Sequence, residues 1–172
     1  RYIKKLDADP DTYGKVRRIL FQAPDYLGAL DDESVDMVVT FRNTHNWVKF
    51  GTARDIYQAM YRVLKPCGTL GVVQHRAEPG ANPMTSAKQG YVPEAWLIDM
   101  LEDIGFRLVA HSEINANPAD TKDYPEGVWT LPPTYRLDQQ NRDKYAAIGE
   151  SDRMTLRFAK PMHLADGGCP VQ

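Results

Sequence analysis

The sequence lacks any hydrophobic run that approaches the about 20 residues needed for a membrane-spanning helix, and it has no run of basic residues. Its 172 residues include 21 Lys and Arg against 23 Asp and Glu, which gives a net charge of −2. A positive excess or a basic cluster is what attracts nucleic-acid backbones and acidic lipid surfaces. We therefore expect neither a nucleic acid nor a membrane as a partner.

Cysteine is scarce as well. Cys67 and Cys169 are the only two, and their spacing does not fit a metal site. A disulfide between them is one option that nothing else in the sequence supports, so the redox compartment stays open at this point. No leader segment is visible, and because the sequence begins at Arg1 rather than Met, we expect a processed or partial product.

What the sequence does contain is an alternation of strand and helix patterns, with 42% hydrophobic residues, enough for one domain-sized core. Apolar runs bounded by breaker residues predict strands at Lys15–Phe21, Val35–Phe41, Leu70–Val73, Phe106–Glu113 and Met154–Phe158. Helical periodicity predicts one helix from Thr52 to the Pro66–Gly68 turn and a second from Pro93 to Gly105.

The remaining segments are less regular. Tyr2–Leu6 fits the end of a helix, and the polar segment 115–149 predicts a long loop that is either functional or poorly ordered. We expect one α/β domain over residues 1–161 and a tail over residues 162–172. Because Val35–Phe41 is nearly all apolar and β-branched, it predicts a strand covered on both faces, with crossover helices on both sides of the sheet.

In open α/β sheets, ligands bind beyond the carboxyl ends of the parallel strands. If the strands ending at Phe41 and Val73 are neighbours, His45 and His75 lie over the same edge of the sheet. The side chains expected around these two histidines are Arg42, Asn43, Asn46, Trp47, Arg76 and Glu78.

Each candidate has a catalytic and a structural interpretation. His45 and His75 fit general bases, because the pKa of histidine lies near working pH, and they equally fit structural histidines that hold the loops after their strands. The pair would bind a metal if Glu78 or Asp152 supplied a third ligand. Without evidence for that third ligand, we predict no metal site.

The arginines and tryptophans also have two alternative roles each. Arg42 and Arg76 fit the bidentate recognition of a substrate carboxylate or phosphate, or they are surface charges. Trp47 and Trp129 either wall a substrate pocket or attach long loops to the core.

Five segments resemble a bacterial family of predicted class I S-adenosylmethionine-dependent methyltransferases, whose members often carry an export signal. The segments are Phe41–Trp47, Gly71–Ala77, Glu113–Pro118, Asp123–Pro133 and Glu150–Leu156, and the resemblance runs from about Asp7 to Pro161. It implies a Rossmann-like, mostly parallel seven-stranded sheet in which the last two strands, 106–113 and 154–158, form an antiparallel pair. It also implies S-adenosylmethionine as the cofactor, a small-molecule acceptor and a periplasmic or secreted protein.

Within this resemblance, we assign roles to residues of the loops at the expected edge. Catalysis is assigned to His45 and His75, and substrate binding to Asn46, Trp47, Arg76 and Trp129. Cofactor binding is assigned to Asp25, Arg42 and Asn43, with Asp25 at the place where such methyltransferases often hold the adenine.

The sequence departs from the family where the cofactor should bind. Such proteins have a glycine-rich turn after the first strand, but no G-x-G spacing occurs in these 172 residues. We expect the sequence to begin just before the third strand and not to bind S-adenosylmethionine at micromolar levels alone.

If the first two strands of the sheet are missing, the sheet has an exposed strand edge and an uncovered apolar face. An N-terminal segment, a homo-oligomer or a second chain would then cover them. The alternative is a non-catalytic or differently catalytic protein that binds a ligand or metal on the same fold.

Overall fold

The computed structural model describes residues 2–162 and 169. The helices are α1 (Tyr2–Asp7), α2 (Pro10–Tyr13), α3 (Thr44–Lys49), α4 (Ala53–Val63), α5 (Pro83–Lys88), α6 (Glu94–Ile104), the 3-10 helix η1 (Gly127–Thr130) and α7 (Arg142–Ile148). The strands are β1 (Val35–Phe41), β2 (Leu64–His75), β3 (Arg107–Ser112) and β4 (Arg153–Ala159). No helix of the described part has the length and apolar character to cross a bilayer.

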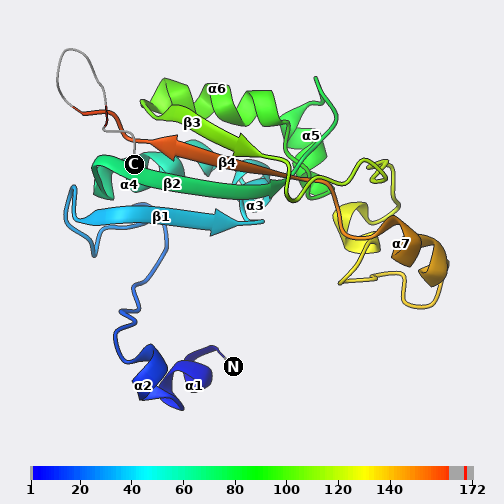
Figure 1. Ribbon diagram of the computed structural model, residues 1–172, viewed down its shortest axis with the longest axis horizontal. Helices are drawn as coiled ribbons and strands as arrows, with labels where there is room; N and C mark the ends of the chain where they lie inside the picture. The colour runs from blue at the N-terminus through cyan, green and yellow to red at the C-terminus, as the bar shows by residue number, and fades with distance from the viewer. Residues whose placement is uncertain (1, 163–168, 170–172) are drawn as a thin grey trace.

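The four strands form one mixed sheet in the order β1-β2-β4-β3 (Figure 1). β1 and β2 are parallel, and β4 runs antiparallel to both of its neighbours. The predicted α/β class and the antiparallel pairing of the last two strands are therefore confirmed. The two long helices, α4 and α6, also lie where the periodicity predicted them, and α6 ends at Gly105 in the left-handed conformation typical of a helix C-terminus.

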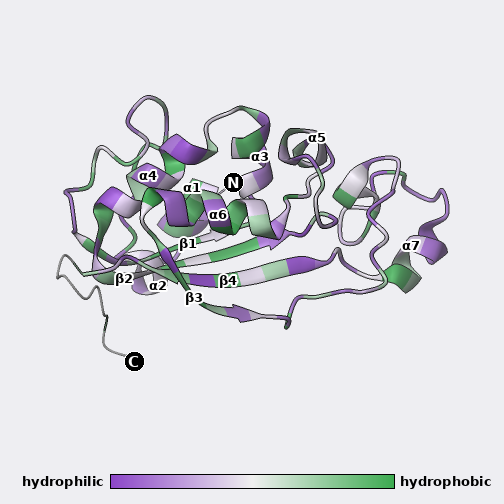
Figure 2. Ribbon diagram, turned by 90° about the horizontal axis from the view of Figure 1, so that it is seen from above, coloured by the Kyte–Doolittle hydropathy of each residue, from purple (hydrophilic) through white to green (hydrophobic). Residues whose placement is uncertain are grey.

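Both long helices cover the same face of the sheet, so the expectation of helices on both faces is wrong for the described residues (Figure 2). Ile56, Met60 and Val63 of α4 and Leu97 and Leu101 of α6 pack there against alternate residues of β2 and β4. Right-handed crossovers explain the arrangement. The chain moves in one direction across the sheet, from β1 to β2 and then outward to β3, so both crossovers lie on one side.

The other face of β1 is bare, which corrects the prediction that this strand is covered on both faces. Met37, Val39 and Phe41 are 61%, 53% and 59% exposed, while Thr40 on the opposite face is buried. β1 is also an edge strand, because β2 is its only partner among the described strands. This edge and face match the exposed edge and uncovered apolar face that the sequence led us to expect.

The predicted strand at Lys15–Phe21 does not form. These residues run without a strand partner, and Leu20 lies largely in solvent. A strand requires a neighbour for its backbone hydrogen bonds, and this segment does not pair with the free edge of β1. It connects the sheet instead to the preceding helices α1 and α2, which lie away from the sheet (Figure 1). The short helices α3, α5 and α7 were not predicted either.

A disulfide joins Cys67 to Cys169, with 5.4 Å between the two Cα atoms. Cys67 lies in the Lys65–Gly68 segment, where a turn was predicted but β2 continues with an irregular register against β1. Lys160 bonds this irregular segment on both sides. Its carbonyl accepts the Cys67 N–H at 2.8 Å, and its own N–H donates to the Gly68 carbonyl at 3.0 Å. The predicted tail lies outside the described residues except for residues 162 and 169.

The disulfide is expected to stabilise the fold. It closes a loop across a sequence separation of 102 residues, and a bridge of this kind contributes about 2–4 kcal/mol, mainly by restricting the unfolded chain. A reducing agent should lower the thermal unfolding midpoint of the wild-type chain, followed by circular dichroism. The double variant C67S/C169S should not respond to reductant, and equal midpoints for the oxidised and reduced wild type would contradict the expectation.

Candidate active site

A cavity of about 370 Å³ lies where the carboxyl ends of β1 and β2 meet segments from three other parts of the chain. The parallel register pairs Phe41 with Val73, and the N–H of Arg42 continues the ladder by donating to the Val73 carbonyl at 2.7 Å. The residues that line the cavity are Phe41, Arg42, His45, Asn46, His75, Val128, Trp129, Pro132, Pro133, Thr134, Arg136, Ser151 and Arg153. In Figure 1, η1 faces the tips of β1 and β2.

His45 lies in the first turn of α3 and is only 4% exposed. The side-chain oxygen of Gln74 lies 3.4 Å from its Nδ1 and accepts its backbone N–H at 3.5 Å. The Gln74 amide nitrogen donates to the Gly90 carbonyl at 2.8 Å, which fixes the orientation of that amide. Because Gln74 therefore presents an acceptor, neutral His45 carries its proton on Nδ1 and leaves Nε2 free to accept one. Burial lowers the pKa of His45, and the bond to Gln74 opposes that shift.

His75 is the last residue of β2, and its ring centroid lies 5.8 Å from that of His45. Its Nδ1 lies 2.5 Å from the Ser151 hydroxyl oxygen, and the side chain is 8% exposed. Burial lowers the pKa of His75 to about 3, with smaller contributions from His45, Arg153 and Arg42. His75 is therefore neutral at ordinary pH and is a weak proton acceptor.

Five of the nine assigned site residues meet at this cavity: His45, His75, Arg42, Asn46 and Trp129. The Trp129 ring approaches His45 edge-on at 5.7 Å between centroids. Asn43 precedes α3 as its N-cap residue, makes no side-chain capping bond and does not line the cavity.

Three assigned residues lie elsewhere, which corrects their expected placement at the edge. Asp25 lies 3.7 Å from Arg62 at the end of α4, because the segment before it does not continue the sheet. The Trp47 ring packs edge-on against Tyr57, with 5.4 Å between the ring centroids, at the main core. This position matches the structural alternative for Trp47, attachment to the core, and not a wall of the substrate pocket. Arg76 is paired at 2.8 Å with Glu94 and at 2.8 Å with Glu113, so it points to other segments.

The metal alternative finds no support in residues 2–162 and 169. They contain no group of three His, Cys, Asp or Glu side chains that could hold a metal ion. The two carboxylates considered as third ligands are directed elsewhere. Glu78 pairs with Lys122 at 3.3 Å, and Asp152 accepts the Asn117 N–H at 3.1 Å.

Sequence reasoning missed the residues that hold the long segment over the cavity. Asp120 is buried and accepts hydrogen bonds from the Tyr91 hydroxyl at 3.1 Å, the Asp152 N–H at 2.8 Å and the Lys122 N–H at 3.0 Å. Asn117 donates from its side-chain amide to the Ile148 carbonyl at 2.8 Å and also bonds Glu150. The one signal available was that 115–149 is too long for an idle loop in a compact domain.

The 3-10 helix η1 forms the roof of the cavity, and it packs against the backbone at Gly90. The Val128 N–H of η1 donates to the Gln89 carbonyl at 3.0 Å, beside Gly90. Gly90 has φ +89°, and a Cβ at this position would clash with the Val128 side chain. Only glycine fits both the conformation and the space, so the same residue supports η1 and orients Gln74.

No family model matches the sequence, and no curated protein is significantly similar to it. Solved structures do share the fold. A putative methyltransferase of Haloferax volcanii in complex with the Trm112 activator has a TM-score of 0.52 and 17% identity, covering 87% of this chain and 61% of that one. The cyclase SpnF gives a TM-score of 0.52 and 16% identity, with 91% and 60% coverage.

A third similar structure is a Burkholderia thailandensis N1-methyltransferase of 1,6-didemethyltoxoflavin with bound S-adenosylhomocysteine. Its TM-score is 0.50 and its identity is 11%, covering 90% of this chain and 55% of that one. The chain thus has the class I methyltransferase fold. It spans about three fifths of the length of the first solved structures it matches, and identities this low show the fold alone.

The depressed pKa of His75 predicts a loss of stability in acid. An unfolded chain protonates this histidine near its ordinary pKa of 6.5, whereas the folded chain does so only near 3. The unfolded state therefore binds more protons between these values, and the free energy of unfolding falls by about 1.4 kcal/mol per pH unit from this group as pH drops. Urea titrations from pH 7 to pH 4 should give a flatter profile for H75Q than for wild type. Identical slopes would contradict the prediction.

Asp120 is expected to be essential for holding the 115–149 segment. D120A leaves two buried donors, the Tyr91 hydroxyl and the Asp152 N–H, and the part-buried Lys122 N–H without their acceptor, which should cost about 3 kcal/mol of unfolding free energy. Asp123 provides a matched control, because this neighbouring carboxylate is exposed and accepts its side-chain hydrogen bond from the exposed Thr121 hydroxyl. D123A should unfold at the wild-type urea concentration, and an equal effect of the two substitutions would refute the role of Asp120.

Proposed function

We propose that the protein is an S-adenosylmethionine-dependent methyltransferase of a small acceptor and that the described residues form the acceptor side of its active site. The observation that carries the proposal is the position of His45. A buried histidine with a free Nε2 lines a cavity at the carboxyl ends of two parallel strands, in a sheet with the class I methyltransferase fold.

In this proposal, His45 is the general base. Its lowered pKa keeps the imidazole neutral at working pH, and the Gln74 contact leaves Nε2 ready to take a proton from a hydroxyl or amine of the acceptor. Trp129 and Asn46 hold the acceptor beside it, and His75, fixed by Ser151, keeps that side of the cavity in shape. S-adenosylmethionine would supply the methyl group, and the acceptor atom that loses its proton to His45 would receive it.

The cofactor fits the described residues only in part. Of the three residues assigned to it, only Arg42 lines the cavity, and the 172 residues contain no G-x-G turn. Most of the cofactor's contacts would thus come from protein outside this sequence. The bare edge and face of β1 support the same view, since a further segment, a second copy or a partner chain would cover them.

A second candidate is a protein that binds a ligand or performs another reaction on this fold. The missing G-x-G turn favours it, and the similar structure of SpnF belongs to a cyclase. In either case, the Cys67–Cys169 disulfide supports an oxidising compartment, periplasmic or extracellular.

Calorimetric titration with S-adenosylmethionine separates the two candidates. The 172-residue chain should give no binding heat at micromolar concentration, whereas the product of the complete reading frame should bind one cofactor per chain. Unit-stoichiometry binding by the 172-residue chain would show that the cofactor contacts are assigned wrongly. If neither protein binds, the methyltransferase proposal is wrong and the second candidate replaces it.

A further inference from the structure

The lining of the cavity is positively charged. Arg42, Arg136 and Arg153 contribute guanidinium groups, and none of the lining residues is an aspartate or glutamate. The two histidines do not add to this charge at neutral pH, because burial lowers the pKa of both. Arg42 and Arg153 also lower the pKa of His75, which shows that their field reaches the interior of the cavity.

Two of the three arginines are neutralised by neighbours. Arg136 pairs with Glu126 at 3.3 Å and stacks over the Trp129 ring at 4.7 Å, and Arg153 forms an ion pair with Glu150. Arg42 forms no ion pair with any carboxylate in the described part of the chain. The cavity therefore presents one uncompensated positive charge.

Arg42 keeps its position at a cost in backbone energy. Its φ is +57°, a left-handed conformation that glycine or asparagine adopts more readily than arginine. Strained residues of this kind gather at functional sites, where the surrounding structure holds them. Here the Arg42 N–H bond to Val73 provides that support and places the guanidinium at the end of β1.

The rest of the lining combines polar residues, which are His45, Asn46, His75, Thr134 and Ser151, with five apolar ones. Phe41, Val128, Trp129, Pro132 and Pro133 form walls beside the arginines. A volume of about 370 Å³ lies within the range of small-molecule sites, which combine apolar walls with a few polar groups that fix orientation. A ligand suited to this lining has one negative charge, an apolar part that lies against these walls, and room for further polar groups.

We propose that the acceptor carries a carboxylate, which binds Arg42 while its apolar body lies against Trp129 and the Pro132–Pro133 turn. The planar guanidinium donates two parallel hydrogen bonds to a carboxylate, and one uncompensated cation matches one monoanion. The proposal rests on the proposed function, because it names the acceptor class of the same cavity. It is nevertheless tested by binding alone, without cofactor or methyl transfer.

The test compares benzoate with benzamide, which has the same shape and no charge. Each is titrated into the 172-residue chain, and the indole N–H signal of Trp129, assigned with W129F, is followed by NMR. Benzoate should bind at least about tenfold more tightly than benzamide, and R42Q should remove that preference. Added salt should weaken the binding of benzoate and leave that of benzamide unchanged.

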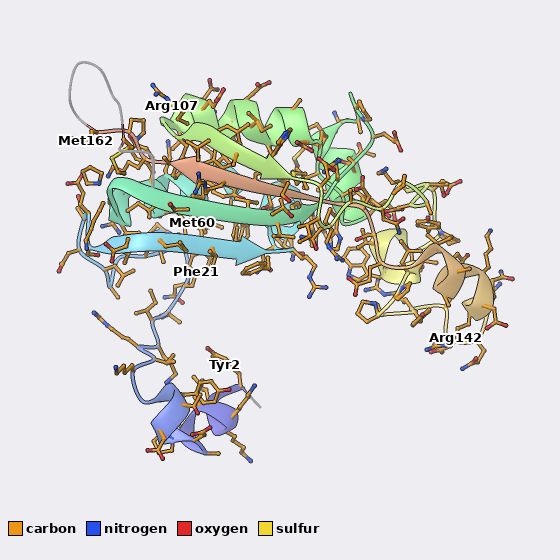
Figure 3. The ribbon with its side chains drawn as sticks, in the orientation of Figure 1. Tyr2, Phe21, Met60, Arg107, Arg142 and Met162 are labelled. Carbon is orange, nitrogen blue, oxygen red and sulfur yellow. A yellow bond between two sulfur atoms is a disulfide. The ribbon has the colours of Figure 1, made fainter. Side chains whose placement is uncertain are left out.

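R107Q is the matched control. Arg107 is also an exposed arginine outside every described ion pair, and it lies at the amino end of β3, far from the cavity (Figure 3). R107Q should therefore bind benzoate like the wild type.

Three results would overturn the proposal. They are equal binding of benzoate and benzamide, an unchanged preference in R42Q, and no shift of the Trp129 signal up to the solubility limit. Tighter binding of phenyl phosphate than of benzoate would overturn the carboxylate assignment. A failure of the product of the complete reading frame to bind S-adenosylmethionine would refute the proposed function and leave the benzoate result standing.

Discussion

The parallel pairing of β1 with β2 is the constraint on which the site depends. Once Phe41 lies beside Val73, the residues that follow each strand leave the sheet at the same edge. Arg42 and His75 are then neighbours, and α3 begins directly afterwards and returns His45 to the same cavity. A shift of this register by one residue would reverse every side chain of β1 and bury the face that carries Met37 and Val39. One ladder thus determines which face meets α4 and α6 and which side chains meet one another.

The second requirement is a cover over the cavity, and it comes from the long segment 115–149, whose regular structure is limited to η1 and α7. Asp120 and Asn117 attach residues 115–149 to the residues just before β4, through the Asp152 N–H and the Glu150 carbonyl, and Asp120 also bonds the Tyr91 hydroxyl ahead of α6. Asp120 is buried and Asn117 is half-buried, and their hydrogen bonds pair backbone and side-chain groups that would otherwise lack partners, which holds the segment against its neighbours. The cavity is therefore formed where a rigid sheet edge meets a loop held by hydrogen bonds.

The sequence predicted well those features that depend on local pattern, and poorly those that depend on a remote partner. The periodicity of α4 and α6, the apolar run of β1 and the rule for carboxyl ends led to His45, His75 and Arg42 at one edge. Lys15–Phe21 has the pattern of a strand but no neighbour to pair with. Arg76 directly follows His75, the last residue of β2, yet Glu94 and Glu113 decide where its long side chain points. Nothing local distinguishes Asp120 from Asp123, because the difference is burial by segments far away in the sequence.

Gly90 connects the shape of the cavity to its acid–base chemistry. The residue supports η1 through close contact with Val128, and its carbonyl orients the amide that sets the tautomer of His45. Any change that moved the roof on this side would also rotate Gln74 and could exchange the protonated and free nitrogens of the imidazole. Evolution could therefore alter ligand preference with less effect on His45 on the wall that follows η1, at Pro132 and Pro133. Related proteins with different substrates should vary along that wall and keep the glycine and the glutamine together.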